Sequence, residues 1–288
     1  MSKIKKIFCY LELIKPRLII GNIITMIGGF FLAFKSEYYI NFYVLLYSVV
    51  GLFFVIASSC LLNNVIDYKI DAKMYRTKNR ILVQNNFLRK QAIVYAIAFF
   101  FLGEFFFINY VNILTAFLSF LGLFIYVVLY SLCKRYSIYS TIIGSFSGSM
   151  PIIIGYCAVK NKFDLCVVLL FLILTCWQIS HFYAISILYE NDYNNIKFPI
   201  FLIEKGFLKT QLNICLHIFL FFISIIMLYL NGFLNTTCNF IMNVLIFIWF
   251  VISYIICKKK SSIFLKKMNV YYSIIIIVSF SFLITVNY

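Results

Sequence analysis

Side chains that could carry out chemistry are concentrated between residues 63 and 80. Asn63, Asp67 and Asp71 are spaced four residues apart, and in a continuous helix each such step turns the side chain by only about 40°. Three oxygen ligands on one face suit a hard divalent cation such as Mg²⁺, which also takes water and phosphate oxygens. Arg76 and Arg80 are of the type that grips a diphosphate through paired hydrogen bonds. The spacing therefore predicts a Mg²⁺ and diphosphate site, with Asp67, Asp71 and Asn63 as metal ligands and Asp67 and Asp71 as catalytic residues.

The same stretch has a simpler interpretation. Lys69, Lys73 and Lys78 also lie in it, and on a solvated loop they would pair with Asp67 and Asp71 without binding a ligand. Its position favours the functional interpretation, because it directly follows an apolar run. A site there would lie at the boundary of water and lipid, which suits a substrate with a diphosphate head and a long apolar tail.

A second group of polar residues lies at the end of the sixth apolar run. Gln178 and His181 are three residues apart, and Glu190 and Asp192 follow. A lone histidine in a membrane helix is commonly a hydrogen-bonded core residue, and we interpret His217 in this way. His181 differs because it is accompanied by Gln178 and the two acids, which would face the aspartate loop if the helices pack side by side. We predict that His181 and Asp192 are catalytic and that Gln178 binds substrate.

The first apolar run has its own polar residues. Lys15 and Arg17 flank Pro16 at its mouth, where cations meet lipid headgroups by default or a bound phosphate as the alternative. Asn22 lies about one turn further in, where an amide hydrogen-bonds a neighbouring helix or lines a polar cavity. The full set of predicted residues that bind diphosphate or acceptor is Asn63, Asn64, Arg76, Arg80, Lys15, Arg17, Asn22, Gln178 and Lys197.

Membrane helices must position these residues. The chain has 288 residues, of which 64% are hydrophobic and three are proline, and many apolar runs approach the length of a bilayer span. Continuous apolar runs favour helices over the alternating strands of a barrel. We predict an all-α polytopic membrane protein, a single transmembrane domain over residues 1–288, with nine helices at about 18–34, 42–64, 91–108, 112–132, 139–159, 165–189, 212–230, 239–257 and 270–287.

The net charge of +16 could suggest a nucleic-acid partner, but the distribution of the charge argues against one. With nine spans, all but three of the 25 Lys and Arg residues fall on one side of the membrane, the exceptions being Lys35, Lys160 and Lys162. The positive-inside rule then places the N-terminus and the long loops in the cytoplasm and the C-terminus outside. On this pattern Lys134 and Arg135 are ordinary topology determinants.

Two features inside the spans have structural interpretations. Glu104 lies in the third run, near its outer end, so we expect a structural role for it. The fifth run carries glycine and serine at close intervals between residues 140 and 155, together with Pro151. Such a stripe allows close helix packing. The alternative is that the small residues leave room for a flat cavity that accommodates a large planar substrate.

The motifs together resemble the UbiA superfamily of intramembrane prenyltransferases. Its first motif, N-x-x-x-D-x-x-x-D, is matched by Asn63, Asp67 and Asp71, and the following Arg-Thr-x-x-Arg by residues 76–80. The chain looks most similar to the protoheme IX farnesyltransferase branch, also called haem O synthases. That likeness runs from about residue 10 to 210, through Lys15-Pro16-Arg17, the run from Asn64 to Asn79, the segment Gly144 to Gly155, Trp177-Gln178, His181 to Ala184 and Asp192-Tyr193.

The resemblance implies nine helices around a central cavity, and transfer of a farnesyl group from farnesyl diphosphate, with addition of water, to a vinyl group of haem B. Mg²⁺ would bind at Asp67 and Asp71. His181 would contact the haem or its propionates, or orient the water. It further implies a multi-pass protein of the bacterial inner membrane whose product, haem O, goes to a haem-copper terminal oxidase. Other branches carry a second aspartate-rich motif where this chain has Ser180-His181 and Asp192, the form expected of the haem branch.

Three rival functions remain open at this point. A UbiA-type enzyme that alkylates an aromatic or quinone precursor would normally carry the second aspartate-rich motif. A transporter usually places its charged site near the bilayer midplane, in repeated halves, whereas here the charges lie at one face. A non-catalytic assembly factor for a haem-copper oxidase would lower oxidase activity without loss of haem O.

Overall fold

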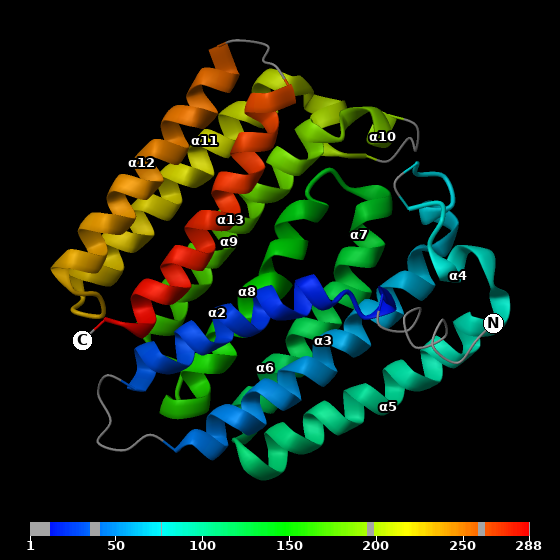
Figure 1. Ribbon diagram of the computed structural model, residues 1–288, viewed down its shortest axis with the longest axis horizontal. Helices are drawn as coiled ribbons and strands as arrows, with labels where there is room; N and C mark the ends of the chain where they lie inside the picture. Colours follow the sequence, from blue (N-terminus) through cyan, green and yellow to red (C-terminus); the bar gives the residue numbers. More distant parts are fainter. Residues whose placement is uncertain (1–11, 35–40, 76, 195–198, 259–262, 288) are drawn as a thin grey trace.

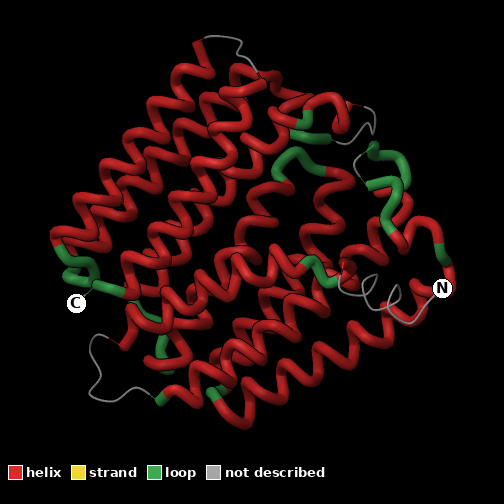
Figure 2. The backbone as a smooth tube through the Cα atoms, viewed as in Figure 1, coloured by secondary structure: helices red, strands yellow, loops and turns green. Residues whose placement is uncertain are grey.

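The computed structural model describes residues 12–34, 41–75, 77–194, 199–258 and 263–287. Throughout these residues the regular structure is helical and no strand is present (Figure 2). Within the same ranges, nine helices are long and apolar enough to cross a membrane. The predicted class, an all-α polytopic membrane protein with nine spans, is therefore confirmed.

The helices follow the predicted order (Figure 1). The fourth span is composite, since a π-helical segment separates two α-helices, and two short helices connect spans. The elements are α2 (Pro16–Phe34), α3 (Phe42–Asp71), α4 (Ile81–Gln84), α5 (Asn86–Tyr110), α6 (Ile113–Phe124), η1 (Ile125–Tyr130), α7 (Ser131–Tyr136), α8 (Ser140–Lys160), α9 (Leu165–Leu188), α10 (Glu190–Asn194), α11 (Phe201–Leu230), α12 (Thr236–Lys258) and α13 (Ile263–Thr285).

Three helices extend seven or more residues beyond their predicted bounds, because hydropathy detects only the part of a helix that contacts lipid. The helix α3 continues from the predicted end at 64 to Asp71, and the hydroxyl of Thr77 caps this extension by donating to the Asp71 carbonyl at 3.0 Å. The helix α11 begins at Phe201 instead of 212, with a break at Gly206, where φ is 81°. The helix α13 begins at Ile263 instead of 270.

The helices α8 and α9 form the inside of the bundle. In each, 61% of the central residues are buried, against 28% in α5 and α12 at the periphery. The small residues of α8 allow its backbone to touch α2, since a Cβ atom added to Gly155 would overlap the carbonyl of Met26. The close-packing interpretation of the small-residue stripe is therefore confirmed at Gly155, whereas Gly144, Ser147 and Gly148 line a cavity.

The polar ends of the inner helices lie at one end of the bundle. The C-terminal ends of α3, α7 and α9 lie at the end that also carries α4 and α10 (Figure 1). Because consecutive spans alternate in direction, the connections that contain the two predicted polar groups meet on the same side.

Candidate active site

The predicted metal ligands share one buried face of α3. Because α3 is helical as far as Asp71, the spacing of four keeps Asn63, Asp67 and Asp71 in line. They are only 5%, 9% and 5% exposed, respectively. The predicted alignment is therefore confirmed, and it brings two carboxylates and an amide into the interior of the bundle.

Cations from other elements pair with both carboxylates. Lys134 of α7 places its Nζ 2.5 Å from Asp67 Oδ2 and 3.4 Å from Asn63 Oδ1. Arg80, at the start of α4, donates to Asp71 Oδ2 at 2.7 Å. Burial of a carboxylate is tolerated only when such partners compensate for lost hydration.

The lysines of the loop are not the partners of these carboxylates. Lys69 lies over the ring of Tyr68, with Nζ 5.9 Å from its centroid, and Lys78 lies over Tyr75 at 4.4 Å. The interpretation of the stretch as a solvated loop with local pairs is therefore wrong for the described residues. The aspartates form a buried cluster that is built from three separate parts of the chain.

Lys134 is a site residue that our sequence interpretation missed, because we assigned it only to topology. It follows the π-helical segment η1, and Nζ lies 5.1 Å from the ring centroid of Tyr130 in the same segment. π-Helical turns are frequent at functional sites. No local pattern marks this one in the sequence, so its lysine could be found only from the tertiary structure.

Lys15 reaches the same cluster from the first span. The Asn64 amide donates to the Leu13 carbonyl at 2.8 Å and so ties the segment before α2 to α3. Lys15 itself has a positive φ of 54°, a strained conformation that is commonly associated with functional sites. Burial lowers the pKa of the Lys15 ammonium; the neighbouring Arg80 charge also lowers it, while Asp71 and Asp67 act in the opposite direction.

The cluster has the donors that a hard cation needs. Asp67 Oδ1 is buried and has no hydrogen-bond partner in the described part of the chain. An unsatisfied buried carboxylate oxygen is costly, and here it lies on the same helix face as the oxygens of Asn63 and Asp71. Oxygen donors of this type and number fit Mg²⁺.

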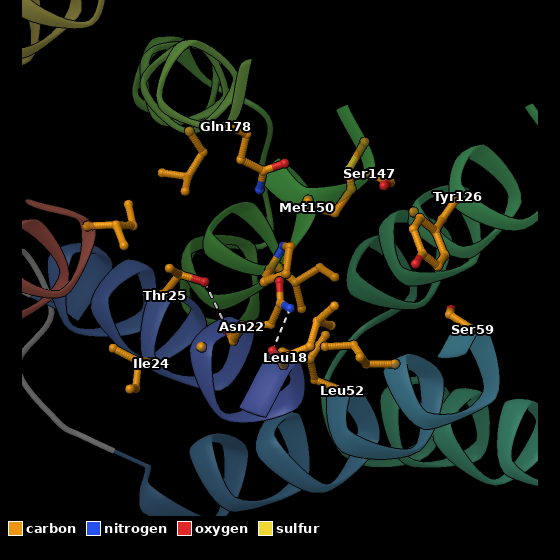
Figure 3. Close-up of a pocket in the computed structure, with 18 of the residues that line it drawn as sticks. Leu18, Asn22, Ile24, Thr25, Leu52, Ser59, Tyr126, Ser147, Met150 and Gln178 are labelled. Carbon is orange, nitrogen blue, oxygen red and sulfur yellow. Dashed lines mark hydrogen bonds between the residues drawn. The ribbon is translucent and has the colours of Figure 1, made fainter. Parts of the chain in front are cut away.

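A cavity of about 390 Å³ lies inside the bundle, deeper than the cluster, and Asn63, Asp67 and Asp71 are not among the residues that line it. It reaches Cys60 of α3, which is seven residues before Asp67 and therefore about 10 Å deeper along the helix. Tyr126 of η1 also lines the cavity and lies within electrostatic range of Asp67 and Arg80. Figure 3 shows α2, α3, α8, α9 and the fourth span around it, with residues such as Asn22, Leu52, Tyr126, Met150 and Gln178.

Four predicted residues of the substrate site line this cavity: Arg17, Asn22, Gln178 and His181. The Asn22 amide nitrogen donates to the Leu18 carbonyl at 2.8 Å, as drawn in Figure 3. Gln178 lies against Gly148, where a Cβ atom would overlap its amide group. The absence of a side chain at 148 therefore gives Gln178 its place at the cavity wall.

Neutral hydrogen bonds hold the second polar group. Trp177 Nε1 donates to the Ser273 carbonyl of α13 at 2.7 Å, and His181 Nδ1 lies 2.6 Å from the Ser273 hydroxyl. His217 Nδ1 instead contacts the Asn213 carbonyl of its own helix at 2.8 Å, which agrees with a core histidine. Glu104 accepts a bond from Ser119 at 2.7 Å, as expected for a structural role.

The acids after α9 do not contact the aspartates. Glu190 forms an ion pair of 3.9 Å with Lys266 of α13, so the prediction that it faces the aspartate loop is wrong. No side-chain bond from Asp192 to the cluster occurs in the described ranges, and its role stays a prediction. Its neighbour Tyr193 nevertheless lies within electrostatic range of Tyr130, the tyrosine beside Lys134. Two predicted diphosphate ligands, Arg76 and Lys197, lie outside the described residues.

Residues 22–285 match the UbiA prenyltransferase family. The chain belongs to this family. It is 41% identical to the protoheme IX farnesyltransferase of Wigglesworthia glossinidia brevipalpis, over 97% of each chain. It is also 47% identical to the protoheme IX farnesyltransferase of Blochmanniella floridana, over 76% of each chain.

Solved structures of other membrane proteins share the fold. A structure described as digeranylgeranylglyceryl phosphate synthase superimposes with a TM-score of 0.78, at 19% identity and 98% coverage of both chains. A UbiA homologue from Archaeoglobus fulgidus, solved with GPP and Mg²⁺ bound, has a TM-score of 0.67 at 12% identity, over 96% of this chain and 99% of its own.

Proposed function

We propose that this chain transfers the farnesyl group of farnesyl diphosphate, with addition of water, to a vinyl group of haem B. The products are haem O and diphosphate. The observation that carries the proposal is a buried cluster of oxygen donors and cations at one end of the bundle, with an apolar cavity deeper inside it, in a chain whose relatives are named protoheme IX farnesyltransferase.

Asp67, Asp71 and Asn63 would hold Mg²⁺, since they present aligned oxygens and one of these oxygens lacks a partner. When bound, the metal supplies positive charge against the diphosphate that leaves during the reaction. Lys134 and Arg80 neutralise the two carboxylates and stand beside the same position.

The cations of the site bind the diphosphate. Arg80 follows α3 in the sequence and Lys15 precedes α2, so the two cations reach the cluster from different parts of the chain. Arg76 and Lys197 are further candidates that the sequence suggests. Their fixed charges stabilise the negative charge that develops on the leaving oxygen as the bond to the farnesyl carbon breaks. Because these cations lie at one end of the bundle, the diphosphate head of the substrate would bind at that end.

The apolar cavity receives the farnesyl chain and the acceptor. Its wall is formed by residues such as Leu52, Val55, Met150, Ile154 and Leu174, which exclude water from the allylic cation. Gln178, Asn22 and His181 are the polar groups on that wall. The vinyl group attacks the farnesyl carbon, and water then captures the cation on the neighbouring vinyl carbon.

A membrane assay tests the proposal. Membranes that contain the protein are incubated with haem B, farnesyl diphosphate and Mg²⁺, with or without a chelator, and the haems are separated by reversed-phase chromatography and weighed by mass spectrometry. We expect a more hydrophobic haem that has gained one farnesyl group and one water, and that disappears with the chelator. Asp164→Asn, on the opposite side of the bundle from the cluster, serves as the active control variant.

Absence of a new haem from folded protein would contradict this function. Transfer to 4-hydroxybenzoate or a quinone precursor in the same assay would identify the aromatic prenyltransferase alternative. Loss of oxidase activity in cells that still contain haem O would identify an assembly factor. The proposal also includes a bacterial inner-membrane location with a cytoplasmic N-terminus, and a haem-copper oxidase as recipient of the product.

A further inference from the structure

We infer that Ser273 of α13 fixes the proton of His181 on Nδ1, so that His181 presents the lone pair of Nε2 to the cavity and accepts the proton of the water that adds to the haem vinyl group. The tautomer stands on geometry alone. The role of Nε2 rests on the proposed function. Ser273 does not line the cavity, whereas His181 does, so Ser273 acts as a positioning residue.

The hydroxyl of Ser273 has one proton and two neighbours. Its Oγ lies 2.6 Å from the Val270 carbonyl oxygen and 2.6 Å from His181 Nδ1. Two oxygen acceptors at 2.6 Å repel each other unless a proton lies between them. The hydroxyl proton is therefore committed to Val270, and Oγ can only accept from His181.

This arrangement determines the state of the imidazole. A neutral histidine carries one N–H, and the hydrogen bond that it makes decides which nitrogen is protonated. With Nδ1–H donated to Ser273, Nε2 of His181 holds an unshared pair. This nitrogen makes no hydrogen bond within the described ranges and is not sealed in the protein interior, and the cavity is the open space beside it.

The ring cannot easily turn away from this position. The indole of Trp177 stacks on the imidazole, with centroids 5.1 Å apart and planes 9° from parallel. The indole is itself held by its hydrogen bond to the Ser273 carbonyl at 2.7 Å. One residue of α13 thus fixes both rings, one through its backbone and the other through its side chain. Ser273 is fully buried, so water does not compete for these bonds.

A lone pair on this wall of the cavity fits the last step of the proposed reaction. After the farnesyl carbon bonds to one vinyl carbon, the other vinyl carbon is a cation. Water oxygen attacks that carbon, and its proton passes to Nε2, which leaves a neutral alcohol and an imidazolium. The proton then returns to solvent. While His181 is neutral, its Nε2 accepts a proton and does not donate one, so the lone pair serves the water-orienting role rather than a hydrogen bond to a haem propionate.

The first arm of the test measures the tautomer without substrate. The chain has two histidines, so protein labelled with ¹⁵N-histidine in lipid nanodiscs gives only two imidazole signal sets, assigned with His217→Gln. His217 is an internal reference, because a carbonyl oxygen can only accept from its Nδ1. We expect both histidines to be protonated at Nδ1 at neutral pH. A His181 protonated at Nε2 would overturn the inference.

Variants of Ser273 connect the tautomer to its cause. Ser273→Ala removes the acceptor and should release His181 to a mixture of tautomers, while His217 stays unchanged. Ser273→Thr keeps a hydroxyl that can make the same two bonds and should restore the Nδ1–H form. Ser224→Ala is the matched control, since Ser224 is a buried serine that donates to its own helix at 2.9 Å and does not line the cavity. A His181 signal that is unmoved in Ser273→Ala contradicts the role of Ser273.

The second arm measures turnover to farnesylated haem. His181→Asn keeps a donor that can reach Ser273 but has no group at the Nε2 position, so kcat should fall about 100-fold, the usual contribution of a general base, at unchanged KM for farnesyl diphosphate. Part of the remaining product should lack the added water, because the cation then loses a proton instead. Ser273→Ala should lose about tenfold in kcat, and Ser273→Thr should recover it.

Wild-type kcat and product in His181→Asn would overturn the role of Nε2. If the wild-type protein forms no farnesylated haem, the proposed function is wrong. The tautomer measurement of the first arm remains a valid test of the inference about Ser273 in that case.

Discussion

The ends of α3 and α9 are both polar, but they are stabilised by different kinds of contacts. The α3 end carries two buried carboxylates whose partners are the ammonium of Lys134 and the guanidinium of Arg80. The C-terminal half of α9 carries Trp177 and His181, whose partners are the carbonyl and the neutral hydroxyl of Ser273. The difference matches the chemistry of the two substrates in the proposed reaction. The charged side chains lie where a diphosphate would bind. The neutral hydrogen-bonding groups lie where the reactive allylic cation would form.

The contrast follows from the cost of burial. A carboxylate removed from water needs full charge compensation, whereas an indole or a neutral imidazole needs only its hydrogen bond. The chain therefore brings cations from the distant helix α7 and from the adjacent loop before α4 to the end of α3. At α9 one residue of the facing helix α13 is sufficient. Substitutions at the α3 end should accordingly have larger effects than substitutions at the α9 end.

The largest effect is expected for the carboxylates themselves. Asp67→Asn or Asp71→Asn keeps the shape of the side chain but removes the charge that a divalent cation needs. Turnover to farnesylated haem should fall about 1000-fold, as when transition-state charge loses its stabilising partner, while the protein remains folded in the membrane. Product formation measured by chromatography, with protein amount from in-gel fluorescence of a tagged chain, gives the ratio.

Asp164→Asn is the matched control for these variants. Asp164 caps α9 by accepting from the backbone of Cys166 and Val167 at 3.1 and 3.3 Å, and an asparagine caps a helix equally well. It should retain close to wild-type activity. Full activity in both Asp67→Asn and Asp71→Asn would remove the metal site from α3.

Lys134 offers a way to test whether the α3 end is built for a cation. Lys134→Met leaves Asp67 without its partner, so in metal-free buffer the protein should lose about 2 kcal/mol of stability, or about 5 °C in melting temperature. Added Mg²⁺ should then raise the melting temperature more than it does in the wild type, because Lys134 no longer competes for Asp67. A thermal shift assay in detergent with a Mg²⁺ titration measures both quantities.

Arg135→Met is the control for this change. Arg135 is exposed, and among the described residues it donates only to the Ile66 carbonyl, at 3.2 Å, so its removal should leave the response to Mg²⁺ as in the wild type. A smaller Mg²⁺ response in Lys134→Met than in the wild type would mean that the metal does not bind at Asp67.

Local patterns in the sequence predicted much of this site. Hydropathy identifies each span because lipid imposes the same requirement on every helix. The interval of four between Asn63, Asp67 and Asp71 predicted their shared face, because helical geometry depends only on residues near in sequence. For the same reason the type of ligand, oxygen from carboxylate and amide, was predictable.

The partners of these residues were not predictable, because they depend on which helices pack together. In the sequence, Lys134 looks like any other lysine at the end of a span. Only the packing of the folded chain shows that it contacts Asp67. Ser273 lies in the ninth span, which contains no predicted site residue, and its contacts to Trp177 and His181 require α13 to lie against α9. The prediction that Glu190 faces the aspartate loop depended on the helices packing side by side, but in the structure Glu190 pairs with Lys266 of α13.

A smaller effect is expected for the contact between α8 and α9. In Gly148→Ala the new methyl group would overlap the amide of Gln178, so that Gln178 must move from the cavity wall. Overpacking of this kind costs about 1–3 kcal/mol, and we expect a lower melting temperature and about tenfold lower turnover. Gln178→Ala removes the obstacle, so adding Gly148→Ala in that background should cost almost nothing further, as a double-mutant cycle would measure. Equal losses from Gly148→Ala in both backgrounds would place the strain elsewhere.

The smallest effect concerns the charge of Lys15. Because burial lowers the pKa of this ammonium, the free protein loses the charge as pH rises through a value below the ordinary 10.4 or so. Binding of the diphosphate should therefore weaken as pH rises towards that range, and KM for farnesyl diphosphate should rise a few fold between about pH 7 and about pH 9.5. An arginine remains charged over this interval, so Lys15→Arg should show a flatter KM profile, whereas Lys209→Arg, an exposed substitution on α11, should follow the wild type. If KM in Lys15→Arg rises with pH as steeply as in the wild type, another group is responsible for the pH dependence. Lys15 would then not bind the diphosphate.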